Sequence, residues 1–122
     1  MGIVQNLASS LANHDWSQAQ SIDPTMPDEA TLANDYNALS KSTVIVTSSS
    51  DDGTTETLRG GYVAWETVGG NQRTSIYCGQ WIVDLGSNTV TSATSIGSND
   101  IGYAQDWTDP ATAVGTVKNL CV

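Results

Sequence analysis

Few residues of this chain have the type and spacing of a catalytic group. His14 is the only histidine, so a multi-histidine metal site is excluded and any Ser-His-Asp triad would depend on this residue. It lies beside Asp15 between two predicted helices, and the sequence contains no Gly-x-Ser-x-Gly segment to form a nucleophile elbow. We therefore interpret His14 as a solvent-facing or capping residue.

Carboxylates could act as a general base. An isomerase or hydrolase pocket needs a carboxylate facing an apolar cavity and a donor for the developing oxyanion. Asp84, Arg73 and Tyr36 are the candidates for these roles. Glu66, near the end of a predicted strand, is a further candidate for the base. Asp84 and Arg73 each adjoin a predicted turn, where charged side chains are usually exposed, so the sequence alone predicts no catalytic residue.

Acidic residues gather in two segments that could hold calcium, which takes roughly six to eight oxygen ligands. The two groups are Asp51, Asp52 and Glu56, and Asp100, Asp106 and Asp109. Neither group has the spacing of an EF-hand, and acidic turns are common without a metal. We predict no metal site and no cofactor.

The two cysteines, Cys78 and Cys121, lack the Cys-x₂-Cys pairs of a zinc site. An even number of cysteines is typical of proteins from an oxidising compartment. We predict a disulfide between them, and the alternative is two unrelated buried thiols. The bridge would tie the chain end to the middle of the predicted sheet and close a loop of about 44 residues, worth about 4 kcal/mol by loop entropy.

Aromatic side chains could stack on a sugar or line a lipid-sized cavity. Trp65 and Trp81 lie on predicted central strands, where aromatic residues usually belong to the core. Tyr103 and Trp107 lie in a predicted loop, so they are the aromatics that we expect to be exposed. A partner surface is predicted there and on the uncovered sheet face.

The elements that position these residues fall into two halves, and the first half is helical. Apolar residues recur at three- and four-residue spacing, which predicts helices over residues 3–13, 16–21 and 25–40. Asp15 is predicted to cap the second helix. The third should begin with Thr25 or Met26 as its cap and Pro27 in its first turn. Its predicted apolar face consists of Leu32, Ala33, Tyr36 and Leu39.

Beyond Lys41 the apolar period changes to two, which indicates strands. Gly- and Asp-rich turns divide the sheet region, 43–96, into four runs: 43–48, 54–68, 72–84 and 89–96. The turns are short enough to join antiparallel neighbours, so the sheet should follow chain order. Bulky residues on both faces and glycines at 60, 61 and 79 predict a curved sheet covered on both sides.

The last segment, 97–122, is predicted to be a polar loop followed by a short helix or tail. Thr108-Asp109-Pro110 reads as the cap and first turn of this helix. Together the elements predict a single α+β domain spanning 1–122, in which N-terminal helices pack on a curved antiparallel four-stranded meander.

Composition limits the partners of this domain. Thirteen acidic residues against four basic ones give a net charge of −9. The basic residues are scattered, so nucleic acid and anionic membrane surfaces should be repelled. No segment approaches the roughly 18 apolar residues of a membrane span, and Met1-Gly2 lacks the pattern of a signal peptide. We expect the natural chain to carry a signal or anchor ahead of this segment, which would place the domain outside the cytoplasm; the alternative is a cytosolic protein.

The pattern of elements resembles the NTF2-like superfamily, a cone-shaped fold also described as cystatin-like. The three N-terminal helices and the run Asn13-His14-Asp15-Trp16 with Ala19 carry this resemblance, and the strand segments 61–66, 73–78 and 81–84 look like the paired long strands of its exported actinobacterial branch. That branch includes extracytoplasmic domains joined through a membrane helix to Ser/Thr protein kinases. The resemblance covers nearly the whole chain as a pattern, without a diagnostic motif.

This superfamily includes ketosteroid isomerase-like enzymes, ligand-binding domains and subunits that dimerise through the sheet, so fold alone does not choose a function. We expect an extracytoplasmic sensor or accessory domain without catalytic activity. It would bind a small apolar ligand or an envelope component, or pair as a homodimer through its sheet. One alternative is a small cavity enzyme of the isomerase, dehydratase or cyclase type, with a carboxylate of raised pKa in an apolar pocket. Another is a structural envelope or virion component, which needs no pocket.

Overall fold

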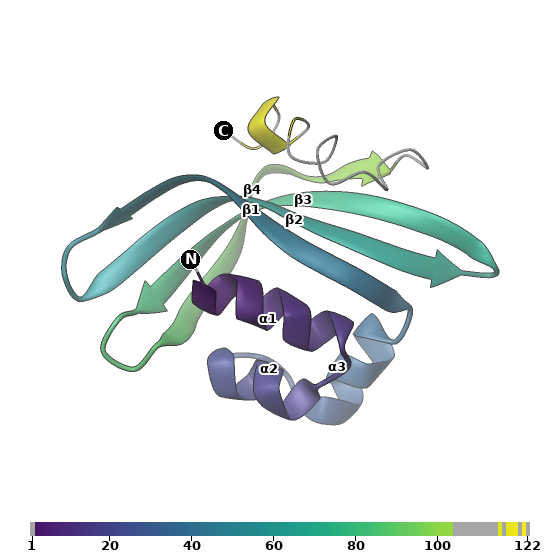
Figure 1. The fold of residues 1–122 in the computed structure, drawn as a ribbon, viewed down its shortest axis with the longest axis horizontal. Coiled ribbons are helices and arrows are strands. Elements are labelled where there is room, and N and C mark those ends of the chain that lie inside the picture. Colours follow the sequence, from purple (N-terminus) through teal and green to yellow (C-terminus); the bar gives the residue numbers. More distant parts are fainter. Residues whose placement is uncertain (1, 104–114, 116, 120, 122) are drawn as a thin grey trace.

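The protein has an α+β fold in which three helices pack on one face of a four-stranded antiparallel sheet (Figure 1). The computed structural model describes residues 2–103, 115, 117–119 and 121, with the backbone alone for 68, 71–73 and 95–103. The helices are α1 (Gly2–Ala12), α2 (Trp16–Ile22) and α3 (Glu29–Tyr36). The strands are β1 (Leu39–Asp51), β2 (Thr55–Val68), β3 (Asn71–Asp84) and β4 (Thr89–Tyr103). Residues 115 and 117–119 are helical and represent the predicted short C-terminal helix.

The sheet follows chain order, β1-β2-β3-β4, as predicted. Its strands bend near their middle and curve around the helices, so the face toward the helices is concave (Figure 1). Glycines occupy the bend, where Gly60 lies opposite Gly79. A Cβ on Gly60 would lie 2.0 Å from the carbonyl oxygen of Ile45 in β1. The glycine is therefore needed for the close approach of the two strands.

Both faces of the sheet are covered, as the bulky residues on both sides of its central strands predicted. The concave face packs with the helices in a core that includes Val4, Leu7, Leu32, Leu58, Trp81 and Val90. The opposite, convex face carries a smaller cluster formed by Val63, Trp65, Ile76, Cys78, Val117 and Cys121. Val117 and Cys121 thus cover the centre of the convex face, across the sheet from the helices (Figure 1).

A disulfide between Cys78 and Cys121 holds the C-terminal segment to β3, which confirms the predicted pairing. Both cysteines are buried. Gly61 provides the space for this contact, because a Cβ there would lie 2.6 Å from a methyl group of Val117. The Thr47 hydroxyl of β1 also donates to the carbonyl oxygen of Cys121 at 3.2 Å.

Side-chain hydrogen bonds fasten α1 along the edge strand β1. The backbone N–H of Val44 donates to the side-chain oxygen of Gln5 at 2.9 Å. The Ser42 hydroxyl donates to the carbonyl oxygen of Ala8 at 2.6 Å. The first of these bonds satisfies a backbone N–H that an edge strand would otherwise leave open. Among the residues that the structure describes, no helix is both long and apolar enough to cross a membrane.

The ends of the helices confirm one predicted cap and correct another. Asp15 caps α2 by accepting a hydrogen bond from the N–H of Gln18 at 3.2 Å. For α3 the cap is Asp28, which accepts from the N–H of Thr31 at 2.8 Å. The predicted cap at Thr25 or Met26 is wrong, because the carboxylate that can reach a free N–H three residues ahead belongs to Asp28. Pro27 precedes α3 rather than lying in its first turn.

Two strands are longer than predicted. Leu39, assigned to the apolar face of the third helix, opens β1, since α3 ends at Tyr36. β4 continues to Tyr103, so the predicted loop after residue 96 is wrong and Tyr103 lies on a strand. The additional residues are mostly polar, because edge strands pair through their backbone without burying every second side chain. The predicted cap at 108–110 lies outside the described residues.

Candidate functional site

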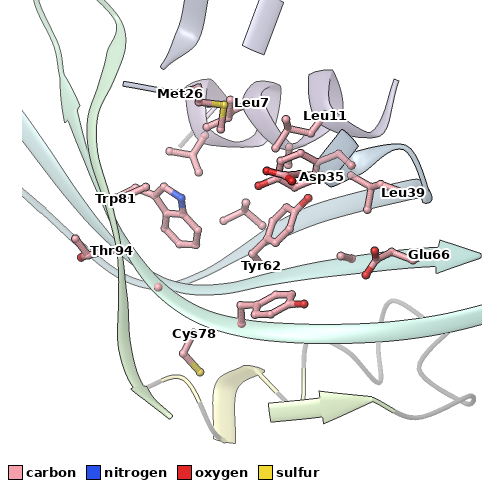
Figure 2. Close-up of a pocket in the computed structure, with 18 residues that line it drawn as sticks. Leu7, Leu11, Met26, Asp35, Leu39, Tyr62, Glu66, Cys78, Trp81 and Thr94 are labelled. Carbon is pink, nitrogen blue, oxygen red and sulfur yellow. The ribbon is translucent and has the colours of Figure 1, made fainter. Parts of the chain in front are cut away.

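A cavity of about 440 Å³ lies between the helices and the concave face of the sheet (Figure 2). Residues of α1 and α3, and of all four strands, line it. Most of its wall is apolar and includes Leu7, Leu11, Leu39, Val44, Ala64 and Trp81. A mostly apolar pocket of this volume with a few polar groups is the usual form of a small-molecule site.

The periodicity of the elements brings these side chains together. On α1, Val4, Leu7 and Leu11 recur at three- and four-residue spacing and therefore share the face toward the sheet. On β2 and β3, alternate residues point to the same face, which brings residues 62, 64 and 66 to the cavity together with 77, 79 and 81. Gly79 has no side chain at the bend, and this leaves space beside the Trp81 ring.

Polar side chains gather at one side of the cavity. They are Asp35 and Tyr36 of α3, Tyr62 and Glu66 of β2, and Tyr77 of β3. Figure 2 shows Asp35, Glu66 and the Tyr62 hydroxyl away from the side marked by Trp81 and Thr94. The cavity therefore has an apolar body and one side that carries two carboxylates and three phenols.

The Tyr62 hydroxyl is buried and has no hydrogen-bond partner among the described residues. Burial is the main cause that raises the pKa of Tyr62 above its ordinary value of 10.0, and the negative charges possible at Tyr36 and Glu66 raise it further. The nearby Ser42 hydroxyl lowers it only in part. The Ser42 hydroxyl donates its proton to the carbonyl oxygen of Ala8, and among the described residues no hydrogen bond joins it to the Tyr62 hydroxyl, which is therefore unpaired. It is protonated at neutral pH.

Tyr36 is perturbed in the same direction. Burial raises its pKa, and the charges of Asp35, Tyr77 and Glu66 add to this effect in that order. The rings of Tyr62 and Tyr77 lie 6.4 Å apart between centroids, at an angle of 31°. The tyrosines and the two carboxylates therefore form one interacting group.

The structure brings some of the proposed catalytic residues to this cavity and leaves others elsewhere. Tyr36 and Glu66 line it. Asp84 does not line it, and its carboxylate accepts a hydrogen bond from the N–H of Gly86 at 2.9 Å in the turn after β3. Arg73 lies at the other end of β3, where its backbone is opposite Glu66. Asp84 and Arg73 are therefore separated by most of the strand.

The four aromatic candidates do not share one surface. Trp81 lines the cavity. Trp65 is buried on the convex face, and the Lys41 ammonium lies 5.1 Å from the centroid of its ring. Tyr103 pairs with Ser75 through the backbone of β4. Trp107 lies outside the described residues.

The acidic loop after β1 is organised by Asp52. Its carboxylate accepts hydrogen bonds from the N–H groups of Thr54 and Thr55 at 2.9 and 2.8 Å. These bonds hold the pKa of Asp52 well below its usual range. Within the described part of the chain, no group of three or more Asp, Glu, His and Cys side chains is arranged to hold a metal ion. Of the second acidic group, Asp100 lies on β4, whereas Asp106 and Asp109 lie outside the described residues.

His14 is exposed and has a structural contact. Its Nε2 atom lies 2.9 Å from the carbonyl oxygen of Leu39, and its ring stacks on Trp16 with centroids 5.1 Å apart. Its backbone has a φ of 59°, which closes the turn between α1 and α2. His14 thus joins this turn to the start of β1, consistent with a capping rather than a catalytic residue.

Asp35 was not among the site residues predicted from the sequence. A signal was present, because Asp35 follows the buried Leu32 by three residues, the spacing that places two side chains on one side of a helix. Asp35 therefore lies beside the cavity while remaining exposed.

Comparison of the chain with protein-family models, curated proteins and solved structures finds no match. The function is therefore inferred from the chemistry of the cavity: its apolar wall, its two carboxylates and its three phenols.

Proposed function

We propose that this chain is a non-catalytic binding domain that holds a small, mainly apolar ligand between its helices and the concave face of its sheet. The cavity of about 440 Å³ carries this proposal, because its apolar wall and clustered polar groups are those of a small-molecule site. The NTF2-like superfamily, which the chain resembles in its order of helices and strands, includes ligand-binding domains.

We further propose that the domain works outside the cytoplasm, as a sensor or accessory domain. The disulfide between Cys78 and Cys121 supports this location, because such bonds persist in oxidising compartments. Homodimerisation through the sheet receives less support, since Val117 and the disulfide already cover the centre of the convex face. The ligand site is therefore proposed in the cavity rather than on the sheet.

A cavity-filling variant tests the binding proposal. Ala64→Leu adds a larger side chain to the cavity wall, whereas Ala30→Leu makes the same change at an exposed position of α3. We expect the neutral fluorophore N-phenyl-1-naphthylamine to bind the wild-type chain and Ala30→Leu at one saturable site. Ala64→Leu should bind it at least about tenfold more weakly, a change of about 1.4 kcal/mol.

The titration is followed by fluorophore emission, with circular dichroism to check that each variant is folded. Equal affinity in all three proteins would show that the fluorophore does not enter the cavity. A structural envelope component needs no cavity ligand, so complete absence of binding would favour that alternative.

A cavity enzyme of the isomerase type is the second candidate, and one observation favours it. Tyr62 places a protonated, unpaired hydroxyl beside a cavity that also contains Asp35 and Glu66. A donor and a carboxylate base in one apolar pocket are the groups that such an enzyme needs. We rank it second because Asp35 is exposed and Glu66 half-buried, which leaves both bases in contact with water.

A further inference from the structure

We propose that the ligand of this cavity is a protonated amine attached to an apolar body. This inference rests on the proposed binding function and adds to it the chemical class of the ligand. The apolar body would occupy the part of the cavity walled by Leu7, Leu11 and Trp81. The ammonium group would lie at the polar side, beside Asp35, Glu66 and Tyr62.

The charges at the polar side favour a cation. Asp35 and Glu66 both line the cavity, whereas no described lining residue is a Lys, Arg or His. Lys41 of the neighbouring strand contacts Trp65 on the opposite face of the sheet. Arg73 lies opposite Glu66 in the strand register, so the experiment below also tests for a ligand of opposite charge. The whole chain has a net charge of −9, which would further disfavour an anion.

The tyrosines indicate a cation with N–H groups. The buried Tyr62 hydroxyl has an oxygen without a partner among the described residues, and this oxygen can accept a hydrogen bond from an ammonium N–H. A quaternary ammonium would balance the carboxylates but leave this oxygen unpaired. The rings of Tyr36, Tyr62 and Tyr77 add aromatic surface at the same side, which attracts cations.

A neutral ligand would fit the apolar wall but gain little from the two carboxylates. A metal ion is also a poor fit, because within the described residues no three ligating side chains converge. An alkyl amine satisfies each feature of the cavity: the apolar wall, the two carboxylates and the unpaired hydroxyl. At neutral pH such an amine is protonated, since its pKa resembles the value of about 10.4 for lysine.

Three probes with the same eight-carbon chain separate these possibilities: octylamine, octanol and octanoate. Their dissociation constants for the wild-type chain are measured by isothermal titration calorimetry at pH 7 and physiological ionic strength. We expect octylamine to bind at least about tenfold more tightly than octanol, a difference of about 1.4 kcal/mol. Octanoate should bind most weakly of the three.

Variants of the cavity residues test which side chains cause the preference for octylamine over octanol. Asp35→Asn combined with Glu66→Gln should reduce the ratio of the octylamine and octanol affinities to about one, with octanol affinity unchanged. Tyr62→Phe should weaken octylamine several-fold and octanol less, because the charge-assisted hydrogen bond from the ammonium is the stronger of the two. Glu29→Gln combined with Asp51→Asn removes two exposed charges that do not line the cavity, and this control should keep the wild-type ratio.

Several outcomes would overturn the proposal. Equal binding of octylamine and octanol would show that the cavity does not prefer an amine, while the proposal that it binds a ligand would stand. Tighter binding of octanoate, lost in Arg73→Gln, would identify a carboxylate ligand instead. If the control variant, Glu29→Gln combined with Asp51→Asn, loses the preference for octylamine over octanol, that preference arises from the overall charge of the chain. Failure of all three probes to bind, together with failure of the fluorophore, would overturn the binding function itself.

Discussion

At the scale of single residues, two buried oxygens in the described part of the chain lack hydrogen-bond partners. They belong to the side chains of Tyr62 and Thr74. Tyr62 borders the cavity, whereas Thr74 does not line it. An unpaired buried hydroxyl costs stability unless something pairs with it, so such a group beside a cavity is a reason to look for a ligand.

We predict that Tyr62→Phe does not destabilise the ligand-free protein. The substitution keeps the ring and removes a hydroxyl that has no partner, so the free energy of unfolding should stay constant or rise by up to about 1 kcal/mol. Urea unfolding followed by circular dichroism measures the change from the midpoint at constant slope. Thr74→Val, at the second unpaired hydroxyl, provides a matched comparison. A loss of more than about 1 kcal/mol in Tyr62→Phe would show that the hydroxyl is paired in solution.

Residue types predicted part of the site. Tyr36 and Glu66 were candidates from the sequence, and both line the cavity. Asp84 was also a candidate but accepts a hydrogen bond within a turn. The difference arises because the sequence shows which residues are acidic but not which of them the folded helices and strands bring to one cavity, and Asp84 instead bonds the N–H of Gly86 in its own turn. Asp35 was missed because a helical acid usually faces solvent.

At the scale of elements, turns were predicted correctly where a side chain hydrogen-bonds to backbone N–H groups of the same turn. The hairpin turn between β1 and β2 was predicted from its Asp and Gly residues, and Asp52 organises it by accepting bonds from Thr54 and Thr55. The order of the strands followed from such short turns. The full lengths of β1 and β4 could not be predicted in this way, since polar edge residues pair through their backbone and show no apolar alternation.

The Asp52 turn should make the hairpin sensitive to acid. The pKa of Asp52 is lower in the folded chain than its ordinary value of 3.8. The hydrogen bonds to its carboxylate therefore stabilise the fold fully at pH values above 3.8. Below it, the unfolded chain takes up a proton that folded Asp52 does not, and this contribution is lost as the pH falls toward the folded pKa. We predict that Asp52→Asn is less stable than the wild type at pH 6 and that this difference shrinks at pH 2.5.

Urea midpoints of the wild type, Asp52→Asn and Asp51→Asn at the two pH values measure this effect. Asp51 contacts the same turn through the N–H of Gly53 at 3.2 Å and serves as the matched control. A difference of the same size and pH dependence in Asp51→Asn would show that the effect does not belong to Asp52. A difference for Asp52→Asn that is independent of pH would contradict the prediction.

At the scale of the whole molecule, the sheet separates two cores that differ in how they are held. The helices contact the concave face through many apolar side chains. The C-terminal segment contacts the convex face through a small cluster and one disulfide. The segment therefore depends on its covalent bond more than the helices depend on any single contact.

We predict that Cys78→Ala combined with Cys121→Ala lowers the free energy of unfolding by about 4 kcal/mol, the loop-entropy value for this separation. That is a large part of the stability of a small domain, which is about 5–15 kcal/mol. Guanidinium unfolding with and without dithiothreitol measures the loss. The reductant should shift the wild-type midpoint toward that of the double variant and leave the variant unchanged. Equal midpoints for oxidised wild type and variant would contradict a stabilising disulfide.

The disulfide also determines how the molecule would transmit force. A pull on the two chain ends would pass from Cys121 across the sulfur atoms to Cys78, since these two residues are covalently joined. Residues 79–120, including β4, would carry no tension. With a sequence separation of 43 residues, the extensible length is shorter by about 150 Å, at roughly 3.5 Å per residue. Stretching would therefore open α1–α3 and the first strands before β4. Chemical reduction of the disulfide would allow residues 79–120 to extend as well.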